Sequence, residues 1–354
     1  MSGEGASRTS HSAPTRRTVH FLVPEGIDDP TRVSGGNIYD ARVSEGLADF
    51  GWHVEQREVQ PDAAAAALAD VPDGGLVLID GLVAGRSADA VVAEAVRLRA
   101  VVLAHMVSEA FPDADPLLVE GERRALGAVG LVVTTSHWTR SELVSRGIAD
   151  AHRLRVATPG TDAAPAAVGT RRGGALLCVG VVAPHKGQDV LVEALAGLPA
   201  RSGWTCTIAG SIDRESAFAQ AVASRAEAAG LGDRVEIMGV LAGAALEAAY
   251  RDADLLIAPS RVESYGMAVA EALRRGIPVL ASEVGGIVEA VAPSAGVVLV
   301  PPGDPVALGA ALEHWLADRA FRAGLTRAAR DGVAGLQDWR DTASDVALAL
   351  EEAA

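Results

Sequence analysis

Short apolar runs alternate with helical patterns along almost the whole chain. In the first half, the runs predicted as strands lie at residues 18–23, 52–59, 76–79, 100–104, 131–134 and 154–157. In the second half, they lie at residues 175–179, 205–209, 234–238, 255–258, 278–281 and 296–300. Strands that alternate with helices favour parallel sheets with crossover connections. The pattern therefore predicts an α/β protein built from doubly wound sheets.

The helical patterns fall between these strands. The first follows a loop that contains Gly35 and Gly36 and is expected at residues 38–50. In the second half, helices are expected at residues 188–198, 216–229, 244–251, 267–275 and 286–291. The end of the chain is predicted to be helical at residues 305–330 and 339–352, with a break near residues 332–335.

The length of 354 residues exceeds what one ordinary core supports and suits two domains. A stretch rich in Ala, Pro and Gly at residues 163–174 is predicted to be the linker. We expect one Rossmann-like domain at residues 18–165, a second at residues 166–335, and a final helical segment at residues 336–354. Residues 1–17 are polar, lack the apolar segment of a signal peptide, and are predicted to be a disordered tail.

Composition narrows the classes of partner. The net charge of −15 argues against nucleic acid, because a basic surface is what neutralises phosphates. It also weakens the case for an anionic membrane surface, although peripheral contact stays open. No apolar run reaches the roughly 20 residues that a membrane helix needs. Cys178 and Cys206 both fall in predicted strands and are expected to be buried, reduced thiols of a cytoplasmic protein.

Two carboxylates flank a predicted helix start in the second half. Glu263 lies in the loop before Gly266, and Glu271 lies within the helix that follows. The first N–H groups of a helix have no partner within the helix and lie at its positive end, so they favour phosphate. In open α/β sheets, ligands bind beyond the carboxyl ends of the strands, where this loop is expected. The segment is therefore predicted to bind a nucleotide diphosphate.

The cation for such a site is predicted from another loop. Lys186 is the only lysine among 31 Lys and Arg residues, and it precedes Gly187. An arginine-rich chain that keeps one lysine suggests a place for a compact ammonium group. A full G-x-G-x-x-G fingerprint and a G-x-x-x-x-G-K-[ST] sequence are both absent from the chain. Dinucleotide and P-loop interpretations therefore lose their main support.

With these residues identified, the chain resembles the retaining glycosyltransferases of family 4, which have the GT-B fold. The resemblance covers nearly the whole chain after residue 17. It is most specific in one ordered set of positions: Pro259, Ser260, Glu263, Gly266, Glu271, Ala272, Gly276, Pro278, Gly285, Gly286 and Glu289. Two further groups match, namely Val179, Gly180, Lys186 and Gly187, and then Pro159, Gly160 and Asp162.

The resemblance implies two Rossmann-like domains that face each other across a cleft. The second domain would hold the nucleotide-diphosphate sugar and the first the acceptor, and the last helix would return to the first domain. The implied reaction transfers the sugar to an acceptor hydroxyl with retention of configuration, by substitution on the same face. It needs no metal and no cofactor besides the donor. The acidic chain favours a small-molecule or glycoside acceptor.

The resemblance also assigns roles to residues. Glu263 is expected beside the donor sugar, Glu271 at the ribose, and His105, which ends an apolar run, beside the transferred sugar. The diphosphate would meet Lys186 and the backbone at Gly36, Tyr265, Gly266 and Met267. Looser expectations place the base against Met238, Gly239 and Val240, and the acceptor near Asn37 and Asp40.

One position departs from the family pattern. Val181 stands where the family often has an arginine, so a second phosphate cation is missing, and Arg261 or His185 is a candidate substitute. Two other interpretations stay open. One is a nucleotide-sugar epimerase of the same fold, and the other is a catalytically silent nucleotide-sugar-binding protein. The sequence does not name the donor base, the sugar, the acceptor or the oligomeric state.

Overall fold

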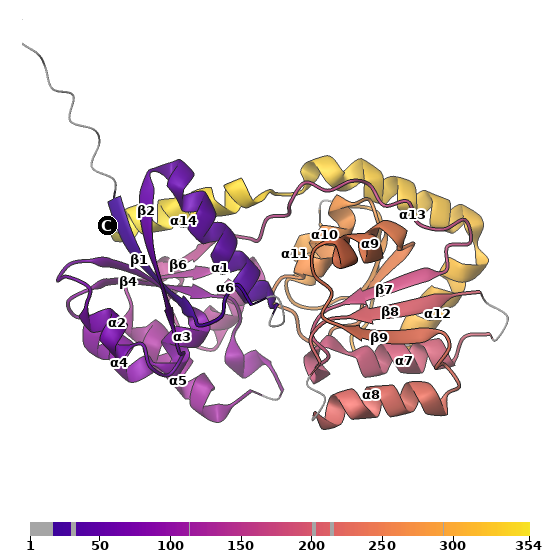
Figure 1. Ribbon diagram of the computed structural model, residues 1–354, viewed down its shortest axis with the longest axis horizontal. Helices are drawn as coiled ribbons and strands as arrows, with labels where there is room; N and C mark the ends of the chain where they lie inside the picture. Colours follow the sequence, from indigo (N-terminus) through magenta and orange to yellow (C-terminus); the bar gives the residue numbers. More distant parts are fainter. Residues whose placement is uncertain (1–16, 30–32, 113, 200–202, 213–215, 293) are drawn as a thin grey trace, which may run out of the picture.

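The computed structural model describes residues 17–29, 33–112, 114–199, 203–212, 216–292 and 294–354. They form two parallel sheets, each with helices on both faces, as the strand and helix pattern predicts (Figure 1). This confirms the doubly wound α/β class and the GT-B architecture. The tail expected at residues 1–17 lies outside the described residues except for Arg17, which begins the first strand.

The first sheet has the strand order β2-β1-β3-β4-β5-β6. Its strands are β1 (Arg17–Pro24), β2 (Trp52–Val59), β3 (Leu76–Asp80), β4 (Arg99–Ala104), β5 (Leu131–Thr134) and β6 (Leu154–Val156). The second sheet has the order β12-β11-β10-β7-β8-β9. Its strands are β7 (Ala175–Val179), β8 (Thr205–Ala209), β9 (Val235–Gly239), β10 (Leu255–Ala258), β11 (Val279–Ser282) and β12 (Val297–Val300).

The helices of the first half, including short 3₁₀ turns, are α1 (Gly35–Gly46), η1 (Leu47–Phe50), α2 (Ala65–Ala69), α3 (Gly81–Arg86), α4 (Ala88–Glu94), η2 (Ser108–Ala110), α5 (Pro116–Ala128), α6 (His137–Ser145) and η3 (Ala151–Arg153). Those of the second half are η4 (Pro184–Lys186), α7 (Gln188–Ala196), α8 (Ala217–Ala228), α9 (Ala244–Asp252), α10 (Met267–Arg274), α11 (Ile287–Val291), α12 (Pro305–Ala317), α13 (Arg319–Asp331), η5 (Gly332–Gly335) and α14 (Trp339–Ala353).

Two helix predictions need correction. The helix expected at residues 38–50 begins earlier, at Gly35, and its last turn is the 3₁₀ helix η1. The single run expected at residues 305–330 is two helices, α12 and α13. Asp318 separates them, because its carboxylate accepts from the N–H groups of Ala320 and Phe321 and so caps α13.

Each strand order contains a switch point. In the first sheet β1 pairs with both β2 and β3, and in the second β7 pairs with both β8 and β10. The chain therefore leaves β1 and β3, and likewise β7 and β10, in opposite directions across the sheet. A crevice forms between the carboxyl ends of such strand pairs, and ligands bind there.

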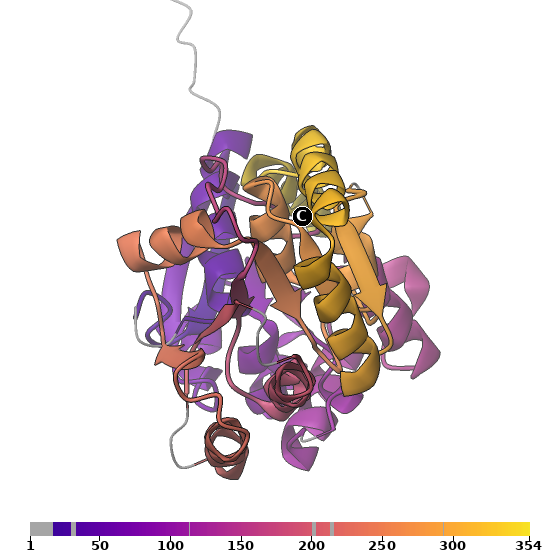
Figure 2. The same ribbon diagram turned by 90° about the vertical axis from the view of Figure 1, so that its right-hand side faces the viewer.

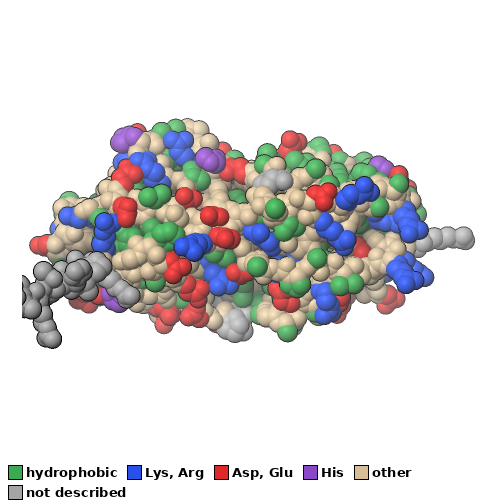
Figure 3. All heavy atoms as spheres, turned by 90° about the horizontal axis from the view of Figure 1, so that it is seen from above, with side chains coloured by type: hydrophobic (Ala, Val, Ile, Leu, Met, Phe, Trp, Pro, Cys, Tyr) green, Lys and Arg blue, Asp and Glu red, His purple; other side chains and the backbone are tan. Residues whose placement is uncertain are grey.

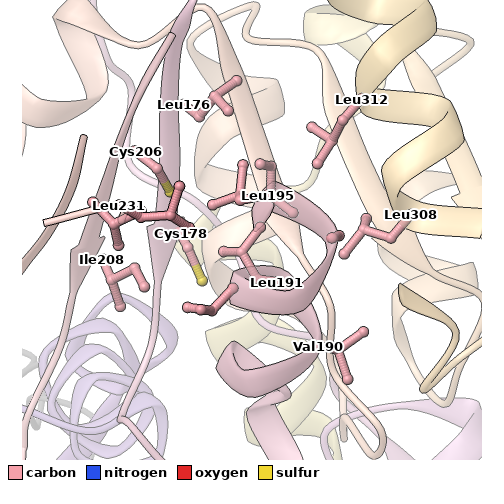
Figure 4. Close-up of a cluster of buried hydrophobic side chains, with 14 of the residues drawn as sticks. Leu176, Cys178, Val190, Leu191, Leu195, Cys206, Ile208, Leu231, Leu308 and Leu312 are labelled. Carbon is pink, nitrogen blue, oxygen red and sulfur yellow. The ribbon is translucent and has the colours of Figure 1, made fainter. Parts of the chain in front are cut away.

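Apolar side chains fill both faces of the second sheet. On one face, residues from β7 and β8 pack against α7 and α12, as Figure 4 shows for Leu176, Ile208, Leu191 and Leu308. Helices α7 and α8 lie side by side on this face (Figure 2). Cys178 and Cys206 belong to the same cluster and form no disulfide. Burial raises the pKa of the Cys178 thiol to about 12, so it stays protonated, as expected of a core thiol.

The chain crosses between the two sheets twice. The first crossing follows β6, and the second leads from α13 through η5 into α14 (Figure 1). Helix α14 packs on the first sheet, where Val346 and Leu350 share a core with Val19 and Phe21. Its N-terminus carries a capping box in which Asp338 and Asp341 satisfy each other's backbone N–H groups. Among the described residues, no helix combines the length and apolar character that crossing a bilayer requires.

The two crossings touch at Gly160. A β-carbon built on Gly160 would lie 2.2 Å from the carbonyl carbon of Asp338, where α14 begins. We expect Gly160→Ala to lower the free energy of unfolding by about 1–3 kcal/mol, because the backbone at this crossing must move to make room. The measurement is urea denaturation. Gly127→Ala is the control, since nothing lies within 4 Å of that position in α5 and alanine favours a helix. Equal stability of the two variants would contradict the role of this contact.

Candidate functional site

Lys186 and Glu263 meet at the switch point of the second sheet. Lys186 ends the turn after β7, Glu263 lies in the loop after β10, and the ammonium and carboxylate groups form an ion pair. The Ser260 hydroxyl donates to the same carboxylate at 3.3 Å. The side chains of Lys186 and Glu263 are 22% and 16% exposed, so the pair is partly open to solvent. Two residues predicted from separate loops are thus brought together.

The backbone of the Lys186 turn fits closely against the loop after β10. Gly187 follows the turn with a φ of 70°, which favours glycine. A β-carbon there would also lie 2.1 Å from the Pro259 carbonyl oxygen. The turn that presents the lysine therefore requires glycine at residue 187 for both backbone and space.

Arg261 braces this turn. Its guanidinium group forms two bonds of 2.8 and 2.7 Å to the Asp189 carboxylate and donates to the Pro184 carbonyl at 2.8 Å. The two terminal nitrogens of Arg261 are thus engaged by Pro184 and by Asp189 of α7, which disfavours its candidate role as the second phosphate cation. The His185 ring packs edge-on against Phe111 of the first sheet's unit, with ring centres 5.2 Å apart.

Helix α10 begins beside the ion pair. Gly266 precedes it with a φ of 102°, and no side chain of the described chain caps its first turn. Tyr265 turns its side chain inward, and burial raises its pKa to about 12, so only its backbone belongs to the helix start. The Met267 sulfur lies 3.2 Å from the place where a β-carbon on Gly35 would be. The glycine loop of the first sheet thus reaches the start of α10.

Glu271 is largely buried within α10. Its carboxylate accepts a 2.7 Å hydrogen bond from the hydroxyl of Tyr250, which lies in α9. Burial raises the pKa of Glu271, although the Tyr250 hydrogen bond and the Arg275 charge oppose that effect. Arg275 stacks over the Tyr250 ring at 4.5 Å and pairs with Glu247. Glu271 is therefore a fixed acceptor and not an acid on the outer side of the helix.

The residues expected at the base lie at the carboxyl end of the edge strand β9. Met238 is 44% exposed, and Gly239 turns the chain with a φ of 76°. The Gly239 carbonyl accepts from the N–H of Gly210 at 2.8 Å, which holds the ends of β8 and β9 together. Val240 follows directly after the strand.

His105 lies at the carboxyl end of β4, between two buried carboxylates. Its Nε2 atom is 2.8 Å from Asp40 and 3.3 Å from Asp80. Burial disfavours the charged ring, but Asp40 and then Asp80 override it and raise the pKa of His105 to about 10. Burial also raises the pKa of Asp40, to about 6. The ring therefore stays protonated near neutral pH and offsets the charge of one of the two carboxylates.

The structure places Gly36 against this ring, because a β-carbon on Gly36 would lie 3.4 Å from the His105 Cδ2 atom. Asp40 was expected to face the acceptor. Its side chain is instead buried beneath the glycine loop, bonded to His105, so that expectation is corrected. Asn37 remains partly exposed in the first turn of α1.

Asp40, Asp80 and His105 also form a grouping that could hold a metal ion, since one ligand atom from each lies within 4.8 Å of the others. Two carboxylates and an imidazole are a donor set that Zn²⁺ accepts. Here, however, Nε2 is at hydrogen-bonding distance from both carboxylates, and the imidazolium supplies the positive charge between them. The three residues therefore form a hydrogen-bonded triad around the imidazolium, in which the Asp40 Oδ2 atom is buried without a hydrogen-bond partner among the described residues.

A carboxylate links the two units across the cleft. Glu289 of α11 accepts from the backbone N–H groups of His137, at 2.8 Å, and Trp138, at the start of α6. A carboxylate at a helix N-terminus is stabilised by the helix dipole. This contact joins residues 152 positions apart and fixes how the two halves face each other.

Three members of the site escaped the residue-level prediction: Asp80, Tyr250 and the interdomain role of Glu289. Asp80 had a signal, because it is a carboxylate that ends an apolar run, as His105 does. Tyr250 had none, since nothing in a helical pattern shows which residue of another helix it meets.

Comparison with known proteins agrees with this geometry. Residues 172–332 match the family of glycosyl transferases, group 1. A D-inositol 3-phosphate glycosyltransferase of Salinispora arenicola is 33% identical over 240 residues, which is 60% of this chain and 52% of that protein. The one from Mycolicibacterium smegmatis is 33% identical over 202 residues, with 53% and 46% covered. The chain thus matches about half the length of these relatives.

Solved structures share the fold over nearly the whole chain. A sucrose-phosphate synthase from Thermosynechococcus elongatus has a TM-score of 0.79 at 22% identity, covering 95% of this chain and 99% of that one. HepE from Anabaena, solved with UDP and glucose, has a TM-score of 0.75 at 20% identity, covering 94% and 99%. Over residues 172–332, the chain is thus similar to the glycosyl transferases of group 1.

Proposed function

We propose that this protein transfers a sugar from a uridine-diphosphate sugar to an acceptor hydroxyl, with retention of configuration and without a metal ion. The observation that carries the proposal is the Lys186–Glu263 pair beside the uncapped start of α10, at the switch point of the second sheet. The family match covers this segment. HepE, whose fold is similar, was solved with UDP-glucose, which supports uridine as the base.

The charges at the site suit the breaking of a sugar–phosphate bond. Negative charge grows on the departing diphosphate, and prearranged cations and N–H dipoles stabilise it. Lys186 supplies the cation, and the backbone from Gly266 to Met267 supplies N–H groups at the positive end of α10. Lys186 is paired with Glu263. A bound donor would draw the ammonium to its phosphates and leave the carboxylate to the sugar hydroxyls.

Glu271 is suited to the ribose. An ionised carboxylate accepts hydrogen bonds from two neighbouring hydroxyls. The Tyr250 hydroxyl donates to it and so keeps it in place before the nucleotide arrives. Met238, Gly239 and Val240 would then border the base at the end of β9.

The first domain contributes His105 and the glycine loop. His105 brings a protonated ring to the carboxyl end of β4, next to Gly36, where the transferred sugar and the acceptor would meet. A surface hollow lined by Asn37, Ile38 and Arg42 adjoins this loop and is the place we assign to a small-molecule or glycoside acceptor. On transfer, the acceptor oxygen bonds to the anomeric carbon from the face that the phosphate leaves. The phosphate oxygen takes the hydroxyl proton.

Substitution of Lys186 should mainly weaken nucleotide binding, whereas substitution of Glu263 should mainly slow sugar transfer. Lys186→Ala is expected to weaken UDP binding at least tenfold, because it removes the phosphate cation, measured by isothermal titration calorimetry. Glu263→Gln should keep UDP binding within about threefold but slow transfer or hydrolysis of UDP-glucose at least 100-fold. Arg225→Gln, a surface control, should change neither. Wild-type rates in both site variants would disprove the assignment, and formation of an epimeric sugar from UDP-glucose without acceptor would indicate an epimerase.

The melting temperature should depend on pH in a way that reflects the proton on His105 between Asp40 and Asp80. Because the folded protein raises the His105 pKa above its ordinary 6.5 to about 10, this contribution is complete below pH 6.5 and is lost as pH rises through 10. Asp80→Asn removes one carboxylate that holds the proton, so its melting temperature should begin to fall at a lower pH than that of the wild type. Thermal melts between pH 6 and 10 test this. The exposed substitution Asp89→Asn is the control, and identical profiles for all three proteins would contradict the triad.

Metal independence has a direct test. We expect transfer from UDP-glucose to keep its rate after dialysis against EDTA, because Lys186, the α10 N–H groups and His105 supply the positive charge. Full restoration by Mg²⁺, Mn²⁺ or Zn²⁺ of a rate lost to EDTA would show instead that Asp40, Asp80 and His105 hold a metal.

A further inference from the structure

Arginine side chains surround a second hollow. It lies at the end of the second sheet opposite to the donor loops. It has a volume of about 500 Å³ and is lined by Arg171 of the linker and by Arg319, Arg322, Arg327 and Arg330 of α13. Gly173 and Asp254 in its wall lie just before β7 and β10. Lys186 and Glu263 follow those same two strands. The hollow and the donor site therefore lie at opposite ends of one strand pair.

The four arginines of α13 share one face of the helix. Together with Ala323 and Thr326 they recur at steps of three and one, so that each residue has another three or four positions away, which is the pattern of one helical face. Figure 3 shows Lys and Arg side chains gathered over the second-domain end of the face that carries α13. Like charges three residues apart repel each other. This repulsion is unfavourable at Arg319 and Arg322, near the positive start of α13, whereas Arg330 in the last turn is favoured by the helix dipole.

Among the described residues, none of these five arginines forms an ion pair with a carboxylate, although Asp318, which caps α13, lies near enough to Arg322 for their charges to interact. Elsewhere, exposed arginines such as Arg124 and Arg225 pair with a carboxylate at 2.6 and 2.7 Å. Two acids do border the hollow. The Asp254 carboxylate is used by Thr170 and by the N–H of Ala175, and Asp331 ends α13. The arginines still outnumber the acids that line the hollow, in a protein whose net charge is −15.

Part of the cluster is fixed in position. Arg322 donates to the carbonyl groups of Trp315 and Leu316, at 2.7 and 2.9 Å, and its stem lies against Gly173, where a β-carbon would come within 2.5 Å of it. Arg171, Arg319 and Arg327 are exposed at the mouth. A fixed guanidinium at the floor with others at the rim is an arrangement suited to an anion that has several charged groups.

We propose that this hollow binds a soluble anion carrying two or more phosphate groups, and that the anion links the interdomain linker to α13. Planar guanidinium groups match phosphate oxygens in pairs, so several arginines favour a polyphosphate over a single carboxylate. A lipid surface is less suited, because among the described residues no large apolar side chain is exposed on α13 to enter a bilayer. The proposal does not depend on the transferase activity.

The probe is inorganic tripolyphosphate, titrated calorimetrically into the full chain at low salt. Arg319→Gln combined with Arg327→Gln should weaken binding at least tenfold. Arg225→Gln combined with Arg251→Gln removes the same charge from other helices of the same domain and should leave binding within about twofold. Both pairs are exposed, so melting temperatures should confirm that each variant is folded.

The other results decide against the proposal. Absence of tripolyphosphate binding would overturn the proposal. Equal weakening in both double variants would also overturn it, because it would show only general attraction between charges. If Lys186→Ala abolished tripolyphosphate binding and the changes at Arg319 and Arg327 did not affect it, the binding would belong to the donor site. Sedimentation with phosphatidylglycerol vesicles but not phosphatidylcholine vesicles, without tripolyphosphate binding, would mean that the arginines meet a membrane.

Discussion

Strands β7 and β10 lie side by side although β8 and β9 come between them in the sequence, and the site depends on this pairing. Parallel strands present their carboxyl ends at one edge of a sheet. When the chain leaves two neighbouring strands in opposite directions, their loops part and leave a crevice. Lys186 follows one of these strands and Glu263 the other, so the crevice receives a cation and an acid. The first sheet repeats the arrangement with β1 and β3, which bring the glycine loop and Asp80 to the facing edge.

Charged side chains at this site are paired with groups of opposite charge. Lys186 is paired with Glu263, and the His105 ring lies between Asp40 and Asp80. Burying a charge without a partner is costly, whereas a pair with good hydrogen bonds offsets most of the desolvation cost. The pairing also prepares the site for a charged ligand, because a diphosphate replaces the carboxylate beside the ammonium without a new charge being buried alone.

The two chain segments that cross between the domains, the linker after β6 and the segment from α13 to α14, run past the second sheet. The linker passes the arginine hollow before it enters β7, and α13 lines the hollow before the chain returns to the first sheet through α14. Gly160 and the start of α14 touch where these crossings meet, and Glu289 joins the domains on the cleft side. An anion between the linker and α13 would therefore act on the segments that set the position of one domain against the other.

The sequence by itself determined the fold class, the strands and most of the candidate donor residues. Apolar runs and helical patterns depend on local spacing, and the glycine and glutamate positions of residues 259–289 form one continuous segment. Tertiary structure alone decided which residues meet. It buried Asp40 under the glycine loop, joined it to Asp80 and His105, set Arg261 to brace the Lys186 turn, and placed Tyr250 on Glu271. The reason is physical: a sequence pattern records which face of an element is buried, whereas strand order and helix packing decide which buried polar group finds which partner.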